Sequence, residues 1–437
     1  MQPEQPSAPL DPLAEAKRAF EAAYAGPDGW ETRLQRSEKN NVLASLSNVV
    51  AVLTRHDEWK GVIGYDAFSG RLMKLRKPPV DGADVGEWSD LDDGKLRLWL
   101  SGKYRIEPKR EVIMEAVSLC ADRNRFHQVR EYLDALAWDG VPRLRLWLAE
   151  HMGATITPYV MAAGSKWLIS AVARIYVPGC KADHVLIFEG KQGVGKSSAL
   201  RILGGDWFTD APFRLGDREG DMITRGKWMV ELSELDSLNK AETAAAKAFF
   251  SSSSARYRGP WEKRPSDVPR QCVFAGTVNH QEYLRDDSGN RRYWPVRIAT
   301  EEDVDLDGLA AVRDQLWAEA VVEFRAGVPW MPTRDEREMF EVEQDERYIG
   351  DAWQERVEAW LAKPDDDGIA RRQVNTSQLL AGALGLDAGK WTLAEQQRLG
   401  RVMRRIAWPK RRIRAAGGLQ WVYERPDGPD DDKGRSS

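Results

Sequence analysis

The stretch HVLIFEGKQGVGKSSALRIL, residues 184–203, decides the fold of the central part of this chain. Its apolar start, residues 185–188, is typical of a buried strand, and SSALRIL at its end is typical of a helix. Between them, residues 190–197 fit the pattern GxxxxGK[ST] throughout. In such a loop, backbone N–H groups and the helix N-terminus face phosphate oxygens, the lysine adds positive charge, and the serine hydroxyl can ligate Mg²⁺. The stretch therefore predicts a P-loop that binds ATP and Mg²⁺; the alternative is a chance glycine-rich turn before a helix.

The predicted ATP contacts come from most of this loop. Lys196 is also a candidate catalytic residue, and Ser197 is also a candidate metal ligand. The ATP-binding candidates are Gly190, Gln192, Gly193, Val194, Gly195, Lys196, Ser197 and Ser198.

A P-loop also needs a carboxylate at the end of a neighbouring strand, to hold the metal and polarise the attacking water. The segment KWMVELSELD, residues 227–236, supplies it. We assign Glu231 to the metal and Glu234, where the strand should end, to the general base. Because two other residues separate these acids, the sequence leaves open which acid binds the metal and which is the general base. Either acid could instead be a solvated strand-end or cap carboxylate.

Two further features follow the acidic segment. The apolar strand of VFAGTVNH, residues 273–280, ends in Asn279, whose amide suits the orientation of a water molecule or a γ-phosphate oxygen. Arg291 and Arg292 then precede another strand, and a guanidinium that enters a neighbour's ATP site would act as an arginine finger. Neighbouring residues on an extended segment point in opposite directions, so at most one of the pair should reach phosphate. Ion pairing within the subunit is the alternative for either arginine.

The rest of the chain divides into segments that differ in their pattern of predicted helices and strands. Its 437 residues and 42% hydrophobic content predict two or three domains. Short strands alternate with helices from residue 184 onward, which indicates an α/β fold with a mainly parallel sheet. GVIGYDAFSGRLMKL, residues 61–75, reads as two strands around a turn. The expected division is 1–30 unassigned and partly disordered, 31–150 mostly helical, 151–328 the P-loop ATPase domain, 335–425 a winged-helix domain and 426–437 a disordered tail.

The sequence gives little support to several other classes of protein. Its longest apolar runs fall short of the roughly 20 residues that span a bilayer, and its polar start lacks a signal peptide, so we expect a cytoplasmic protein without membrane contact. Its three cysteines lack the spacing of a zinc site or a disulfide framework. Asp90, Asp92 and Asp93 cluster near the N-terminus, but we interpret them as a solvated loop rather than a nucleotidyl-transfer site.

The C-terminal region concentrates positive charge although the whole chain carries a net charge of −4. From Arg398 to Arg414 there are eight Lys and Arg residues and no acid. In the predicted helix 393–406, apolar residues gather on one face and arginines on another, as in a recognition helix packed at its back. The hairpin 410–423 would be the wing, and the alternative is a solvated basic surface that helps subunits associate. The duplex-DNA candidates are Arg398, Arg401, Arg405, Lys410, Arg411 and Arg412.

The order of these motifs resembles the virulence-associated protein E family of phages, prophages and pathogenicity islands. The resemblance is strongest over residues 120–300 and includes YLDALAWDGVPRL before the P-loop. It implies an AAA+-like motor similar to superfamily 3 helicases, with residues 190–197 as Walker A, 231–234 as Walker B, Asn279 as sensor 1 and the Arg291–Arg292 pair as the finger.

The resemblance also implies a hairpin that faces the pore of a ring, between Walker B and the sensor strand. The candidates for gripping a single DNA strand there interleave charge and rings, although the aromatic residues could instead anchor the hairpin. They are Arg256, Arg258, Trp261, Lys263 and Arg264. The implied function is an ATP-dependent DNA helicase or translocase, a homo-oligomer and by family a hexamer, in replication of a phage or other mobile element. The alternative is a DNA-binding switch ATPase, in regulation or defence, that does not unwind DNA.

Overall fold

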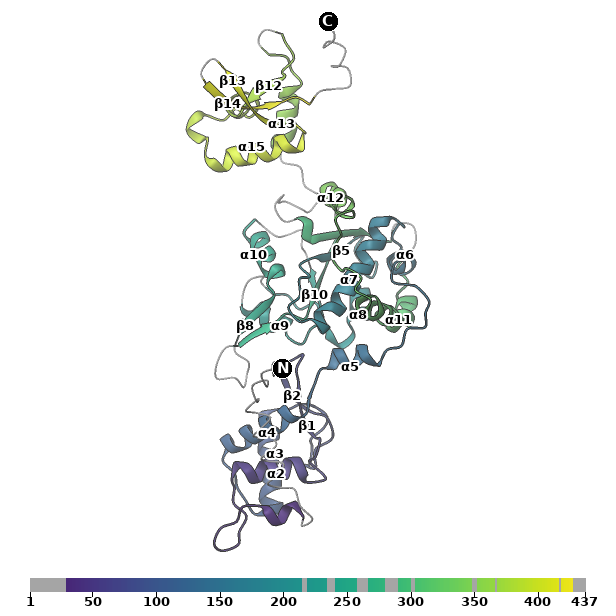
Figure 1. The fold of residues 1–437 in the computed structure, drawn as a ribbon, viewed down its shortest axis with the longest axis vertical. Coiled ribbons are helices and arrows are strands. Elements are labelled where there is room, and N and C mark those ends of the chain that lie inside the picture. The colour runs from purple at the N-terminus through teal and green to yellow at the C-terminus, as the bar shows by residue number, and fades with distance from the viewer. Residues whose placement is uncertain are drawn as a thin grey trace, which may run out of the picture.

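The chain folds into three units that follow one another along the long axis of the molecule (Figure 1). The structure is a computed structural model, and it describes residues 29–213, 218–233, 240–257, 266–279, 290–299, 303–347, 352–365, 368–415 and 418–426. The predictions for residues 1–28 and for the tail 427–437 lie outside this described part.

A parallel sheet of five strands forms the middle of the central unit, in the order β11-β5-β10-β7-β6. Every pair of neighbours in it is parallel. The four predicted strands are confirmed; β6, only two residues long, was not predicted. The strands are β5 (Val185–Glu189), β6 (Phe208–Thr209), β7 (Met229–Ser233), β10 (Val273–Val278) and β11 (Tyr293–Arg297).

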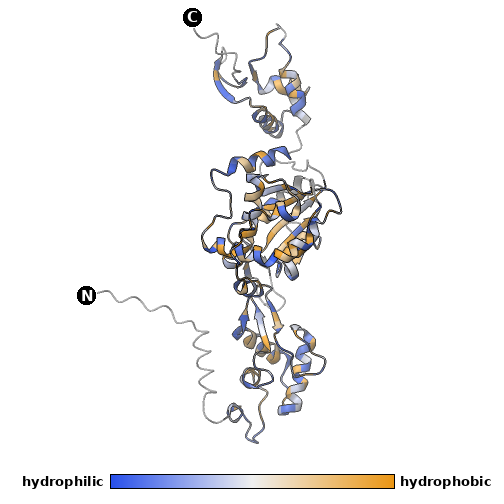
Figure 2. Ribbon diagram, turned by 90° about the vertical axis from the view of Figure 1, so that its right-hand side faces the viewer, coloured by the Kyte–Doolittle hydropathy of each residue, from blue (hydrophilic) through white to orange (hydrophobic). Residues whose placement is uncertain are grey.

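Helices cover both faces of this sheet, which explains why its strands are mostly apolar (Figure 2). Leu186 and Phe188 share one hydrophobic cluster with α7 (Pro158–Tyr176), α8 (Lys196–Gly204) and α11 (Leu306–Arg325). Val185 and Ile187 point the other way, toward the phenylalanines of α10 (Lys240–Ser251). The shorter elements of this unit are η2 (Gly205–Trp207), α9 (Arg218–Thr224), β8 (Ser254–Tyr257), β9 (Ser266–Pro269) and η4 (Asn290–Arg292).

The central core extends on both sides of the predicted range 151–328. Residues of α5 (Gln128–Ala135) and α6 (Trp147–Met152) lie in the same cluster as the sheet. On the other side, Phe340 of α12 (Arg337–Glu346) packs its ring 4.9 Å from Tyr159 and 5.0 Å from Trp294. Packing therefore joins the described residues between 128 and 347 into one body.

The N-terminal unit has a hydrophobic cluster of its own and combines helices with a small sheet ordered β3-β2-β1-β4. The predicted hairpin is confirmed, since β1 and β2 pair antiparallel from Asp66↔Arg71 to Ile63↔Lys74. Its elements are η1 (Trp30–Arg33), α2 (Leu46–Arg55), β1 (Ile63–Asp66), β2 (Arg71–Lys74), β3 (Gly86–Glu87), α3 (Asp90–Tyr104), α4 (Arg110–Arg123) and β4 (Arg125–Phe126).

The expectation of a solvated loop at the aspartate cluster is wrong. Asp92 and Asp93 lie in the first turn of α3 and are buried. Asp92 accepts from the backbone N–H of Ser89 and pairs with Lys74 at 2.6 Å, while Asp93 accepts from the indole of Trp88 at 2.9 Å. Burial alone would raise the pKa of Asp92, but its contact with Lys74 holds the pKa below the usual value. These carboxylates therefore begin a helix and anchor it to the sheet.

The C-terminal unit packs helical segments against an antiparallel sheet ordered β12-β14-β13. Leu399, Val402 and Met403 of α15 are buried in its core, as predicted for the back of that helix. Its elements are α13 (Ala352–Leu361), β12 (Gln373–Asn375), α14 (Thr376–Gln378), η5 (Leu379–Ala383), η6 (Ala388–Lys390), α15 (Leu393–Arg405), β13 (Lys410–Ala415) and β14 (Gly418–Glu424). No helix in the described part of the chain has the length and apolar character needed to cross a bilayer.

Candidate functional site

The loop between β5 and α8 has a backbone that only glycine adopts readily. Gly193 and Gly195 have φ angles of +88° and +95°, in the left-handed region where a Cβ is strained. Gly195 is also the N-cap of α8, so the first turn of that helix opens directly onto the loop. Gln192, Ser197 and Ser198 are exposed there, which leaves the loop accessible to a ligand.

Lys196 is buried under this loop and is surrounded by oxygen atoms. Its Nζ donates to the carbonyl oxygens of Gly190 at 2.5 Å and Lys191 at 3.0 Å, and to Oδ1 of Asn279 at 2.9 Å. Burial lowers the pKa of Lys196, and the nearby Glu231 opposes that shift. Its three acceptors are uncharged, so a phosphate group would compete strongly for the ammonium.

Glu231 is the acidic member of the site and is only 3% exposed. Its Oε1 accepts hydrogen bonds from Ser197 Oγ at 2.6 Å and from Thr277 Oγ1 at 2.9 Å. Its Oε2 is buried and has no hydrogen-bond partner among the described residues. A carboxylate and a hydroxyl are oxygen ligands of the kind Mg²⁺ takes, and a buried carboxylate oxygen without a donor suits a cation. Ser197 and Glu231 therefore fit the metal predicted for them.

These side chains meet because their strands are neighbours. Glu231 on β7, Thr277 on β10 and the loop after β5 all lie toward the carboxyl edge of the sheet, where ligands bind in open α/β sheets. Asn279 directly follows β10. Sequence reasoning missed Thr277, whose only signal is a hydroxyl near the end of an apolar strand. Glu234, the predicted general base, lies outside the described residues, because the structure describes β7 only to Ser233.

Arg291 and Arg292 lie at the opposite edge, and the expectation that they point apart is wrong. They belong to the 3₁₀ helix η4 rather than to an extended segment, and both contact the buried carboxylate of Asp183, at 3.2 Å and 3.4 Å. Arg292 also donates to Oγ of Ser251 at 2.8 Å and 3.0 Å. Asp183 precedes β5, and β11 starts in register with it at Tyr293↔Val185. Neither arginine therefore reaches the P-loop of its own chain.

A buried ion pair that the sequence did not reveal holds the start of the P-loop. Glu189, the last residue of β5, is 1% exposed and accepts from Nε of Arg347 at 3.1 Å. Arg347 follows α12 and also contacts Glu343 and Glu346. Burial alone would lower the pKa of Arg347, but the surrounding carboxylates raise it. The pair ties α12 to the strand that carries the loop.

The predicted DNA contacts are described only in part. Of the pore-hairpin candidates, Arg256 pairs its backbone with Asp267 across β8 and β9, whereas Arg258, Trp261, Lys263 and Arg264 lie outside the described residues. The side chain of Arg401 is likewise not described.

The remaining predicted contacts lie in the C-terminal unit and differ in their surroundings. Arg398 lies 4.1 Å over the ring of Trp353, and Arg405 donates to the carbonyl of Asp345 at 3.0 Å. Lys410, Arg411 and Arg412 are exposed on β13. Exposed cations therefore lie on the hairpin and also at the end of the helix, where Arg405 is exposed, although these two helix arginines also make contacts within the chain.

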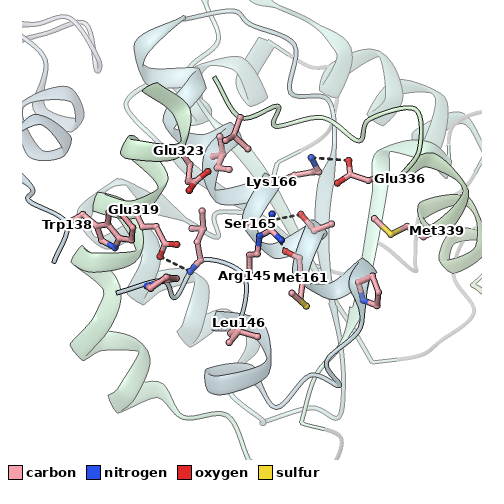
Figure 3. Close-up of a pocket in the computed structure, with 16 residues that line it drawn as sticks. Trp138, Arg145, Leu146, Met161, Ser165, Lys166, Glu319, Glu323, Glu336 and Met339 are labelled. Atoms are coloured by element: carbon pink, nitrogen blue, oxygen red, sulfur yellow. Dashed lines mark hydrogen bonds and ion pairs between the residues drawn. The ribbon is translucent and has the colours of Figure 1, made fainter. Parts of the chain in front are cut away.

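A separate cavity of about 700 Å³ lies between α7, α11 and the segments 138–146 and 328–339 (Figure 3). Its wall is mainly apolar, with Met161 and Met339 among its residues. Its buried lysine, Lys166, pairs with Glu336 at 3.1 Å. None of the residues of the P-loop site lines this cavity.

Comparison with known proteins gives one family match. Residues 133–349 match the model of the virulence-associated protein E-like domain, a range that contains the P-loop, Glu231, Asn279 and both edge arginines. No curated protein matches the sequence. Among solved structures, the apo structure of the NrS-1 C-terminal region covers 83% of this chain and 95% of its own, with 11% identity and a TM-score of 0.40. An A form apo structure of that region covers 84% and 96%, with 11% identity and a TM-score of 0.38. Through residues 133–349, the chain belongs to the virulence-associated protein E-like family.

Proposed function

We propose that this chain is an ATP hydrolase that acts as a DNA motor. The observation that carries the proposal is the convergence of two contacts at one edge of the sheet. Lys196 contacts Asn279 at 2.9 Å, and Ser197 contacts Glu231 at 2.6 Å. A lysine under a glycine loop, a hydroxyl, a buried carboxylate and a strand-end amide form the set that binds a nucleotide phosphate with its metal and positions water.

Each residue has a defined task in this proposal. Lys196 exchanges its carbonyl and amide acceptors for oxygens of the β and γ phosphates, so its positive charge opposes the charge of the transferring group. Ser197 and Glu231 hold Mg²⁺, which when bound supplies charge neutralisation between those phosphates. Asn279, released from Lys196, is then free to orient the attacking water. Glu234 accepts the proton of that water as the general base.

The arginines at the other edge support a site shared between subunits. Arg292 is only 14% exposed, and Asp183 and Ser251 fix its guanidinium, so little conformational entropy remains to be lost on binding. Because it lies at the amino edge, it can serve only the P-loop of a neighbouring copy. A contact that pairs one edge of the sheet with the other is heterologous, and repetition of such a contact gives a ring when the rotation between subunits closes. We therefore propose a homo-oligomeric ring, with six subunits by family resemblance.

DNA is the proposed substrate of the motor. In the C-terminal unit the order helix, strand, helix, helix, strand, strand is the order of a winged helix, and its hairpin carries Lys410, Arg411 and Arg412. The virulence-associated protein E-like domain supports a role in replication of a phage or other mobile element. The proposed activity is that of a helicase or translocase of the superfamily 3 type.

One feature favours the second candidate, a DNA-binding switch ATPase. Arg347 contacts Glu189 next to the P-loop, and Arg405 contacts Asp345 two residues before Arg347. Nucleotide binding at the loop could thereby change the position of the C-terminal unit without unwinding.

Strand displacement decides between these candidates. The full chain is incubated with forked DNA carrying a labelled strand, ATP and Mg²⁺, and both ATP turnover and release of the strand are measured. A helicase shows DNA-stimulated turnover and ATP-dependent release, whereas a switch shows turnover alone. Turnover that is indifferent to DNA would overturn the motor proposal. Native mass measurement with and without ATP tests the ring on the same sample.

A further inference from the structure

The hairpin of β13 and β14 extends beyond the sheet to which it belongs. The third strand, β12, pairs only with the end of β14, from Asn375↔Val422 to Gln373↔Glu424. Residues 418–421 pair with β13 alone. The outer half of the hairpin is therefore a two-stranded ribbon that projects from the unit.

One face of this ribbon changes from buried to exposed toward its tip. The register sets Lys410 opposite Tyr423, Arg412 opposite Trp421 and Arg414 opposite Leu419, and side chains of such alternate pairs share one face. Tyr423 is 3% exposed and closes the core, whereas Trp421 is 54% exposed and Leu419 is 60% exposed.

Trp421 lies between two cations on this face. Nζ of Lys410 is 5.8 Å and Cζ of Arg412 is 5.9 Å from the centre of its ring. On the opposite face, Arg411 pairs with Glu424 at 3.1 Å. The ribbon therefore presents an exposed aromatic ring flanked by two cations on one face, whereas the cation of the opposite face is paired with a carboxylate.

The chemistry of this face selects among possible partners. A stable protein interface covers about 800 Å² on each partner, far more than one indole and one leucine provide. The backbone of a DNA duplex offers anions to the cations, but its bases are stacked and leave no free face for the ring. An unpaired nucleotide offers both, because its base has an open face and its phosphates lie beside it.

We infer that Trp421 stacks on an unpaired base while Lys410 and Arg412 contact the adjoining phosphates. The hairpin thus recognises the single strand at the end of a duplex, in addition to the duplex contacts proposed for its cations. This inference rests on the proposed function, because it concerns a chain that acts on DNA.

The test measures binding of the full chain to three labelled DNAs of matched sequence: a single strand, a forked duplex and a blunt duplex. Trp421→Ala is expected to weaken binding to the single strand and the fork about 5- to 100-fold and to leave the blunt duplex nearly unchanged. Trp421→Phe keeps an aromatic face and should recover most of the loss. Arg412→Gln should weaken binding to all three DNAs and reduce the salt dependence by about one counterion. Arg411→Gln is the matched charge control on the opposite face, and it should affect the three DNAs equally.

Equal affinity of Trp421→Ala and the wild type for the fork would overturn the inference, as would an equal loss on all three DNAs with an unchanged melting temperature. In either case wild-type binding and DNA-stimulated turnover would leave the proposed function standing. A wild-type chain that binds none of the DNAs would instead overturn both.

Discussion

The carboxyl and amino edges of the central sheet hold different charged groups in different surroundings. At the carboxyl edge, Lys196 is surrounded by oxygen acceptors, and one oxygen of Glu231 has no donor among the described residues. At the amino edge, Arg291 and Arg292 share the carboxylate of Asp183. β5 contributes five residues between the edges, Val185–Glu189, which at about 3.3 Å per residue separates them by roughly 16 Å.

Under the proposed function, this separation divides the residues of one ATP site between two subunits. A phosphate bound at the carboxyl edge lies too far from the arginines of its own chain for direct contact. In the proposed function the carboxyl edge binds phosphate, metal and water, and the amino edge supplies guanidinium groups that Asp183 already holds in place. Under the proposed function each edge is half of an ATP site, and a neighbouring copy supplies the other half.

Arg292→Ala gives the largest expected effect, because an arginine finger contributes about 10³- to 10⁵-fold to phosphoryl transfer. ATP turnover should fall by at least 10³-fold while nucleotide binding, measured by filter binding or calorimetry, stays near the wild type. A mixture with the Lys196→Ala chain should then regain activity, since about a quarter of the interfaces in random rings pair two intact edges. A finger that acts within its own chain would give no recovery in the mixture.

Lys196→Ala removes the positive charge of the carboxyl edge. Turnover should fall by about 10²- to 10³-fold, and nucleotide binding should weaken as well, because the lysine contacts phosphate in both ground and transition state. The matched control is Lys191→Ala, which removes an exposed lysine from the same loop. Comparable losses in the two variants would show that general charge, rather than the buried position of Lys196, governs binding.

Glu231→Gln tests the metal side of that edge with little change in shape. The amide can still accept from Ser197 and Thr277, but it has lost its negative charge. We expect the Mg²⁺ concentration for half-maximal turnover to rise by about 10- to 100-fold. Thr277→Val is the control, since it removes one hydrogen bond and keeps the carboxylate; its Mg²⁺ requirement should change far less. An unchanged Mg²⁺ requirement in Glu231→Gln would assign the metal elsewhere.

The motifs of the carboxyl edge could be found in the sequence because each of them lies within a short segment. The P-loop pattern, the apolar strands and the strand-end Asn279 lie in short segments whose order fixes where they meet. The partners of those residues were not predictable in the same way. Thr277 and Arg347 act on residues 46 and 158 positions away, and nothing in their own surroundings marks them.

The amino edge shows a second limit of sequence reasoning. The sequence marked Arg291 and Arg292 as candidates, but the predicted directions of their side chains were wrong because the segment forms a 3₁₀ turn instead of an extended strand. Asp183, which gathers both, precedes a strand and looks like any polar residue at a strand start. The prediction of a solvated loop at the aspartates of α3 was wrong because their partner is distant in the sequence: only the fold brings Lys74 to Asp92.

The smallest expected effect is a change with pH in the free energy of unfolding, caused by a histidine at the amino edge. His184 is fully buried beside Asp183, stacks 3.7 Å from Trp294 and contacts Ser170 at 3.0 Å. Burial lowers the pKa of His184 to about 3, helped by the positive charges of Arg174 and Lys166. The unfolded chain takes up this proton near pH 6.5 and the folded chain does not, so stability is full above pH 6.5 and falls as the pH drops. At pH 5 this residue alone should lower the free energy of unfolding by about 2 kcal/mol.

Thermal or urea unfolding between pH 8 and pH 5 measures this loss in the wild type and in His184→Phe. The phenylalanine keeps a ring against Trp294 but takes up no proton, so its stability should depend less on pH than that of the wild type. Loss of the contact to Ser170 lowers its stability at every pH and does not affect the comparison. If the two proteins lose stability in parallel toward pH 5, His184 does not carry the loss and this prediction is wrong.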